Sequence, residues 1–185
     1  MKNITIDSNG VLLTALYSGG VILGSSLMVA FPAVRHFADR FLINEWLQKM
    51  SITELAIIEV VVSLGVCTAV FSAGLSLVGY PMIYFTPLFA GLFSGIFLFA
   101  FLISDTTMET LKCIVMTPLY CAAVCALLIA CDYASIMSGC LIREKGGREA
   151  GETKKYTIRI ILLTLIVIAF NVLYSMLIVL FRYFN

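Results

Sequence analysis

The sequence predicts an all-α membrane protein: a single integral membrane domain (1–185), built as a polytopic transmembrane helix bundle of about five spans. Hydrophobic residues make up 61% of the chain, and the mean hydropathy is +1.04. Charged residues make up 12%, about half the share typical of soluble domains. Apolar segments recur along the chain, and each is long enough to cross a bilayer, which takes about 20 residues.

The first predicted span covers residues 11–34. The preceding segment, MKNITIDSNG, is polar, and no A-x-A cleavage site follows the apolar stretch. We therefore expect an uncleaved first span and not a signal peptide. Aromatic and charged residues alternate in residues 35–50, which is typical of a segment lying at the lipid–water interface.

The second predicted span covers residues 53–78. Ser51 and Glu54 have the spacing of a capping box, which predicts a helix start. We expect Glu54 and Glu59 to lie in the first turns of this helix, before the charge-free residues 60–78 that are long enough to span.

The third predicted span covers residues 82–104 and follows the second through a very tight turn. Gly79 can adopt the left-handed conformation that ends a helix, and Pro81 favours the start of the next one. Pro87, near the start of this span, is expected to bend it.

The last two predicted spans cover residues 111–142 and 157–180, joined by a basic loop at residues 143–156, REKGGREAGETKKY. The fourth span is long and contains Pro118. We expect either a kink at this proline or a short interfacial helix before the main span.

Five spans place the two termini on opposite sides of the membrane, and the charge distribution indicates which side is inside. With the N-terminus inside, the inner side carries seven of the twelve Lys and Arg residues, six of them between Arg143 and Arg159. The positive-inside rule therefore predicts a multi-pass membrane protein with a cytoplasmic N-terminus.

Small residues at four-residue spacing predict close helix packing, because helices in lipid gain little from burying apolar surface against each other. The sequence leaves open whether these residues pack inside one bundle or form an interface with a partner or a second copy in a homodimer. We group these small residues with the tight turn (Gly79 and Pro81) and with Pro118 as candidates for helix packing or for an interface. The small residues are Gly20, Gly24, Gly65, Ala69, Ala73, Gly91, Gly95, Ala122, Ala126, Ala130, Ala134 and Ser138.

Two polar residues lie deep in predicted spans. Asp132 is in the fourth span, and Asn171 is in the middle of the fifth. A carboxylate at this depth is costly, so Asp132 is either a proton or ion site or a helix-joining hydrogen-bond partner, paired with Asn171, a serine or a tyrosine.

Motifs for catalysis are absent from the sequence: there is no GxSxG, HExxH or P-loop pattern, and His36 is the single histidine. The six cysteines form no CxxC pair, so we expect neither a metal site nor a cofactor. No basic face is interleaved with aromatic residues, so nucleic acid is not an expected partner. The expected surroundings are a lipid bilayer.

The order of these features resembles the stage II sporulation protein M family of integral membrane proteins. The resemblance covers residues 11–185. It depends on the first span, GGVILGSSLMVAFP, the hairpin SLVGYPMIYFTPLFAGLFSGIFLFAFLIS, the proline in MTPLY, the basic loop and the final apolar span. Leu119 and Tyr120 stand where family members often carry Gln-Asn, so the resemblance is to a divergent member.

The resemblance implies a non-catalytic scaffold of the bacterial cell membrane. In endospore formers, the family member anchors peptidoglycan hydrolases at the septal membrane while peptidoglycan is remodelled during engulfment. Membrane-associated peptidoglycan hydrolases are thus the partners that the resemblance implies. The alternative interpretation is a small transporter or permease subunit, acting through Asp132 or paired with an ATPase.

Overall fold

The computed structural model of this protein describes residues 8–38, 51–76, 79–103, 107–143 and 150–183. The described residues are almost entirely helical and contain no strand. Their helices are α1 (Ser8–Ala30), α2 (Pro32–Ala38), α4 (Ile52–Gly74), α5 (Tyr80–Ile103), α6 (Thr107–Arg143) and α7 (Ala150–Tyr183).

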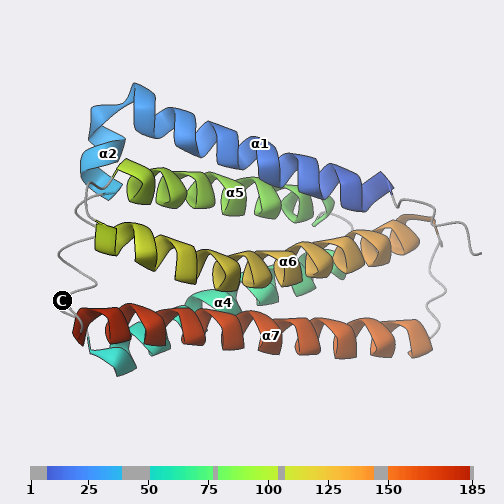
Figure 1. The fold of residues 1–185 in the computed structure, drawn as a ribbon. Coiled ribbons are helices and arrows are strands. Elements are labelled where there is room, and N and C mark those ends of the chain that lie inside the picture. Colours follow the sequence, from blue (N-terminus) through green and yellow to red (C-terminus); the bar gives the residue numbers. More distant parts are fainter. Residues whose placement is uncertain (1–7, 39–50, 77–78, 104–106, 144–149, 184–185) are drawn as a thin grey trace, which may run out of the picture.

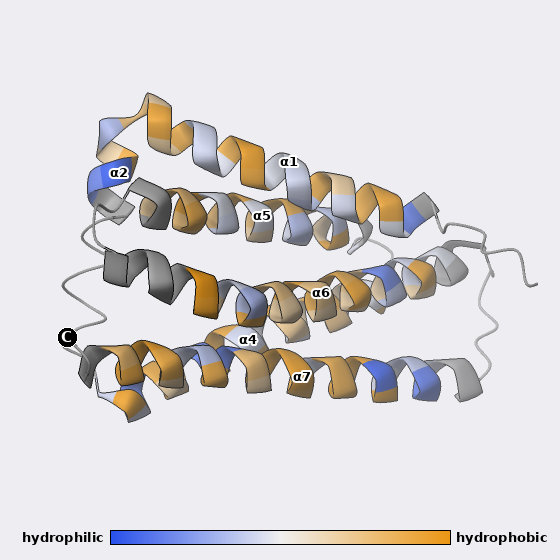
Figure 2. Cartoon of the chain, in the orientation of Figure 1, coloured by the Kyte–Doolittle hydropathy of each residue, from blue (hydrophilic) through white to orange (hydrophobic). Residues whose placement is uncertain are grey.

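Five of these helices are long and apolar enough to cross a membrane. Their candidate spans are Asn9–Ala30, Ile52–Gly74, Pro81–Ala100, Ile114–Gly139 and Thr153–Phe181. Large apolar side chains on all five stay exposed, among them Ile22, Val61, Phe89, Ile114 and Leu165. Figure 2 shows the hydrophobic colouring along the long helices and hydrophilic residues on α2 and the first turns of α7. The predicted fold class, an all-α bundle of five spanning helices, is confirmed.

The long helices lie side by side, and successive ones run in opposite directions (Figure 1). Helix α6 is central: α1 and α5 pack on one side of it, and α4 and α7 on the other. The most extensive contact between any two helices is that of α1 with α5. The start of α1, the end of α6 and the start of α7 lie at one end of the bundle, here called the basic end because Lys154 and Lys155 lie there. Helix α2 and the end of α7 lie at the other, the α2 end.

The first span ends four residues earlier than the sequence suggested, and its helix starts earlier, at Ser8. Helix α1 ends at Ala30, and Pro32 begins the separate helix α2. The Phe31 N–H still donates to the Leu27 carbonyl at 3.0 Å, but Pro32 has no N–H and disfavours helical geometry at the residue before it. Helix α2 includes the first residues of the expected interfacial segment, and residues 39–50 lie outside the described residues.

The capping box at the start of α4 is present in full. The Glu54 N–H donates to Ser51 Oγ at 3.3 Å, and the Ser51 N–H donates to Glu54 Oε2 at 2.8 Å. The helix ends at Gly74, before the expected residue 78. At the turn that follows, a β-carbon added to Gly79 would collide with the backbone of Ala73, so the chain passes very close to the end of α4.

Helix α5 begins at Tyr80 with Pro81 in its first turn, and the Ile83 N–H donates to the Gly79 carbonyl at 3.2 Å. The fourth predicted span forms one helix, α6, which continues through Pro118, so there is no separate interfacial helix before it.

The predicted basic loop 143–156 is shorter than expected. Arg143 is the last residue of α6, and α7 already begins at Ala150. The residues AGETKKY therefore extend the apolar part of α7 as helix, which fits the good helix propensity of Lys, Glu and Ala. Residues 144–149 lie outside the described residues.

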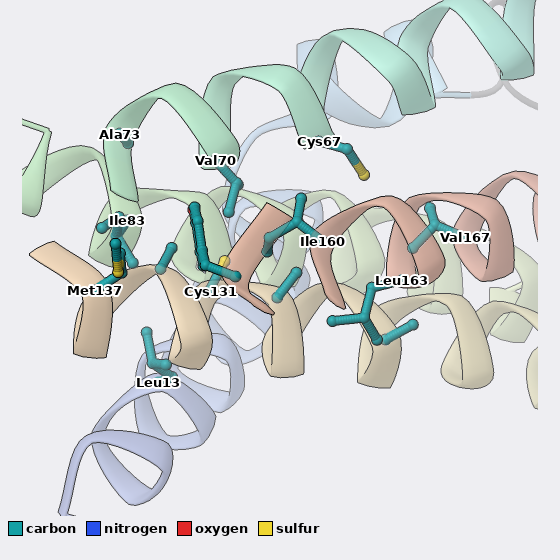
Figure 3. Packing of buried hydrophobic residues seen from close by; sticks show 14 residues of the cluster. Leu13, Cys67, Val70, Ala73, Ile83, Cys131, Met137, Ile160, Leu163 and Val167 are labelled. Atoms are coloured by element: carbon teal, nitrogen blue, oxygen red, sulfur yellow. The ribbon is translucent and has the colours of Figure 1, made fainter. Parts of the chain in front are cut away.

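The main core cluster is built around small side chains of α6. Ala126, Ala130 and Ala134 are buried, so the backbones of the neighbouring helices can approach α6 closely. Figure 3 shows the larger side chains that fill the space between them, contributed by all five long helices: Leu13, Cys67, Val70, Ile83, Met137, Ile160, Leu163 and Val167.

Candidate functional site

Four buried glycines form the contact between α1 and α5, here called the glycine interface: Gly20 and Gly24 on α1, and Gly91 and Gly95 on α5. A β-carbon added to any of them would collide with backbone atoms of the opposite helix. At Gly91, for example, it would collide with the Tyr17 carbonyl and lie 3.1 Å from the Gly20 Cα. The two glycine pairs that the sequence singled out are thus placed directly against each other.

Spacing alone does not produce such a contact. Gly19 and Gly65 also lie within spanning helices, yet a β-carbon added to either would meet no atom within 4 Å. Gly65 belonged to the small residues of the second predicted span, so the structure does not use every position of that pattern for helix contact.

A polar network beside the glycine interface joins α1, α5 and α6. The Tyr17 hydroxyl donates to Ser94 Oγ at 3.0 Å, and Ser94 Oγ donates to the Ala90 carbonyl at 2.6 Å. The Tyr120 hydroxyl lies 2.9 Å from Ser94 Oγ and is the donor, because the single Ser94 proton goes to Ala90. Ser94 is fully buried, so its oxygen collects hydrogen bonds from two other helices in the interior.

Further hydrogen bonds join α7 and α6 to α4. The Asn171 amide Nδ2 donates to the buried Ser63 Oγ at 2.8 Å. Towards the basic end, the Tyr156 hydroxyl donates to the Phe71 carbonyl at 3.2 Å, and their rings stack with centroids 5.6 Å apart. Ser138 Oγ donates to the Ser76 carbonyl at 3.2 Å. The last turn of α4 therefore receives a hydrogen bond from α7, and the chain just after it receives one from α6.

Asp132 is half-buried on α6, and Ser135 Oγ donates to its backbone carbonyl at 2.8 Å. At the next position, the Tyr133 ring lies 4.8 Å from the guanidinium carbon of Arg159 on α7. The sequence left open a pairing of Asp132 with Asn171, but the Asn171 amide donates to Ser63.

The remaining candidate residues divide by burial. Ala126 and Ala130 belong to the main core cluster. Pro118 and Pro81 are exposed, Pro118 on the surface of α6 and Pro81 in the first turn of α5. Within the part of the chain that the structure describes, no group of three or more His, Cys, Asp or Glu side chains could hold a metal ion.

Glu59 lies about two turns from the start of α4, as the sequence predicted. The candidate span Ile52–Gly74 contains both Glu54, which is exposed, and Glu59, which is half-buried. The spacing of Glu59 did not enter the sequence prediction: Glu59, Ser63 and Cys67 follow one another at intervals of four and share one face of α4.

We predict that Gly91→Leu combined with Gly95→Leu lowers the melting temperature in detergent by about 10 °C, because each leucine must separate two backbones already in contact. Membrane insertion should be unchanged, since leucine favours lipid. The matched control is Gly19→Leu with Gly65→Leu, which adds the same volume where no atom lies near. Equal melting temperatures for the two double variants would contradict a role of the glycine interface in stability.

We also predict a favourable coupling between Tyr17 and Ser94. A double-mutant cycle of Tyr17→Phe and Ser94→Ala, measured by unfolding in detergent, should give about 0.6 kcal/mol and no more than about 1.7 kcal/mol, the range found for hydrogen bonds between membrane helices. A cycle of Tyr133→Phe and Ser94→Ala should be additive, because Tyr133 lies against Arg159. Additivity in both cycles would mean that the network contributes nothing to packing.

Comparison with known proteins identifies no relative of this chain. No family model, curated protein or solved structure matches the chain. The resemblance to the stage II sporulation protein M family therefore stays an expectation from the sequence.

Proposed function

We propose that this protein is a non-catalytic scaffold of the bacterial cell membrane, which holds membrane-associated peptidoglycan hydrolases in place. The observation that carries the proposal is that polar side chains in its interior form hydrogen bonds between helices. Tyr17, Ser94, Tyr120, Asn171 and Tyr156 all make hydrogen bonds that join one helix to another. Such bonds, together with the glycine interface, support a rigid bundle whose outer surface presents docking positions to other membrane proteins.

Peptidoglycan hydrolases enter the proposal only through the resemblance to the stage II sporulation protein M family. That resemblance concerns the Gly79–Pro81 turn, Gly91, Gly95 and Pro118. The structure gives the turn and the two glycines packing roles, which is compatible with a scaffold built on the same plan.

A small transporter or permease subunit is the second candidate. The observation that favours it is the presence of two half-buried acids, Glu59 and Asp132, among the three acids within candidate spans, the third being the exposed Glu54. Acidic residues inside membranes often mark proton or ion pathways.

The test of the scaffold is cross-linking of the tagged protein in native membranes, followed by purification and mass spectrometry. We expect peptidoglycan hydrolases among the enriched proteins, at equal yield for the wild type and for Asp132→Asn, because a scaffold needs no titrating carboxyl group. Enrichment of an ATPase, or loss of cellular function in a normally folded Asp132→Asn variant, would contradict the scaffold and support the second candidate.

We further propose that the basic end lies in the cytoplasm, which places the N-terminus there as well. Single cysteines at Asn9, Ala33 or Lys154, introduced after replacement of the six native ones, would report the orientation. An impermeant thiol reagent added to intact cells should label the cysteine at Ala33 and spare the other two. Labelling at Lys154 and not at Ala33 would invert the topology.

A further inference from the structure

Ser175 on α7 is buried in an unusual way. It is 1% exposed, and its hydroxyl has no hydrogen-bond partner among the described residues. Other hydroxyls in these helices donate to the carbonyl one turn back, as Ser26 does to Ile22 and Thr164 does to Ile160. Buried polar groups are nearly always paired, so the Ser175 oxygen calls for a ligand that the chain itself does not supply.

The hydrogen bond from Asn171 to Ser63 fixes what lies opposite Ser175. Helices α4 and α7 are antiparallel neighbours, so one turn forward on α7 corresponds to one turn back on α4. One turn beyond Asn171 is Ser175, and one turn before Ser63 is Glu59. These four residues therefore form one continuous area between the two helices, here called the α4–α7 polar patch.

Every group that the α4–α7 polar patch offers to a ligand is an oxygen: the Glu59 carboxylate, the Ser63 and Ser175 hydroxyls and the Asn171 amide oxygen. The Asn171 amide nitrogen is already used as a donor to Ser63. Oxygen ligands of this kind suit hard cations.

On α7, no described basic side chain lies near the level of Ser175, and on α2 the basic residues are Arg35 and His36, at the end of the bundle where α4 starts. Arg159, on the same helix as Ser175, is about 24 Å away along the α7 axis, and Lys154 and Lys155 are further still. An ionised carboxylate inside the membrane is costly unless a positive charge accompanies it. A proton on Glu59 is the competing explanation, because a protonated carboxyl group can donate a hydrogen bond to the Ser175 oxygen. The experiments below separate the proton from the cation.

We propose that Glu59, Ser63, Asn171 and Ser175 form a binding site for an alkali cation, Na⁺ being the probe of choice, within the membrane-spanning bundle. The carboxylate supplies the balancing charge, and the hydroxyl and amide oxygens replace part of the hydration shell of the ion. Since the site joins α4 to α7, bound cation stabilises the bundle. This inference does not depend on the scaffold function.

The first test is the melting temperature in detergent with NaCl, LiCl, KCl or choline chloride at equal ionic strength. Saturating Na⁺ should raise the melting temperature of the wild type by about 5 °C over choline, because a ligand that binds only the folded state stabilises it. Glu59→Gln should abolish this increment. Ser175→Ala should reduce it while folding normally in choline, since Ser175 has no hydrogen bond to lose. Asp132→Asn, the matched control, should keep it.

Equal melting temperatures in all four salts would overturn the proposal, as would an increment that survives in Glu59→Gln. A second measurement uses dicyclohexylcarbodiimide, which modifies protonated carboxyl groups inside membranes, with the modified residue located by peptide mass spectrometry. Na⁺ at ten times its dissociation constant should slow modification of Glu59 about tenfold. The same rate in Na⁺, K⁺ and choline would mean that a proton alone neutralises the carboxylate, and the cation site would be wrong.

Discussion

The contact on which the bundle depends is the meeting of α1 and α5 backbone to backbone at four glycines. Lipid tails are as apolar as the helix surfaces, so the association of these helices relies on close packing and not on removing apolar surface from water. Glycine permits that approach because it has no side chain. The same approach brings Tyr17 within hydrogen-bonding distance of Ser94, and Ser94 in turn joins both helices to Tyr120 on α6.

On the other side of α6, hydrogen bonds at different depths set how α4 and α7 align. Asn171 meets Ser63 in one half of the bundle, and Tyr156 meets the end of α4 in the other. Each such bond contributes only about 0.6 kcal/mol on average between membrane helices, so no single one determines the fold. Two bonds at separate depths nevertheless specify one axial register, because a slip of one helical turn would break both.

Hydropathy and local rules were enough to predict the five spans, the Ser51 cap and the glycine faces, since each of these depends on residues close together in sequence. The break at Pro32 was also a local signal, but the apolar residues on both sides concealed it. The inferred placement of Glu59 opposite Ser175 depends on the antiparallel register of α4 and α7, which no local pattern contains. The same holds for the choice of α5 as the partner of α1, because several helices carry small residues at suitable spacing.

The unequal lengths of the spans bear on the membrane around the protein. At 1.5 Å per residue, the candidate spans in α6 and α7 are about 39 and 44 Å long, whereas that of α5 is about 30 Å, the thickness of a typical hydrocarbon core. Helix α6 is shielded by its neighbours, but α7 meets lipid along much of its length. Lys154, Lys155 and Arg159 lie in the first turns of α7, so its apolar part is residues 160–181, about 33 Å long. The extra length of α7 therefore lies at the basic end, where these long side chains can extend to the lipid headgroups instead of stretching the bilayer.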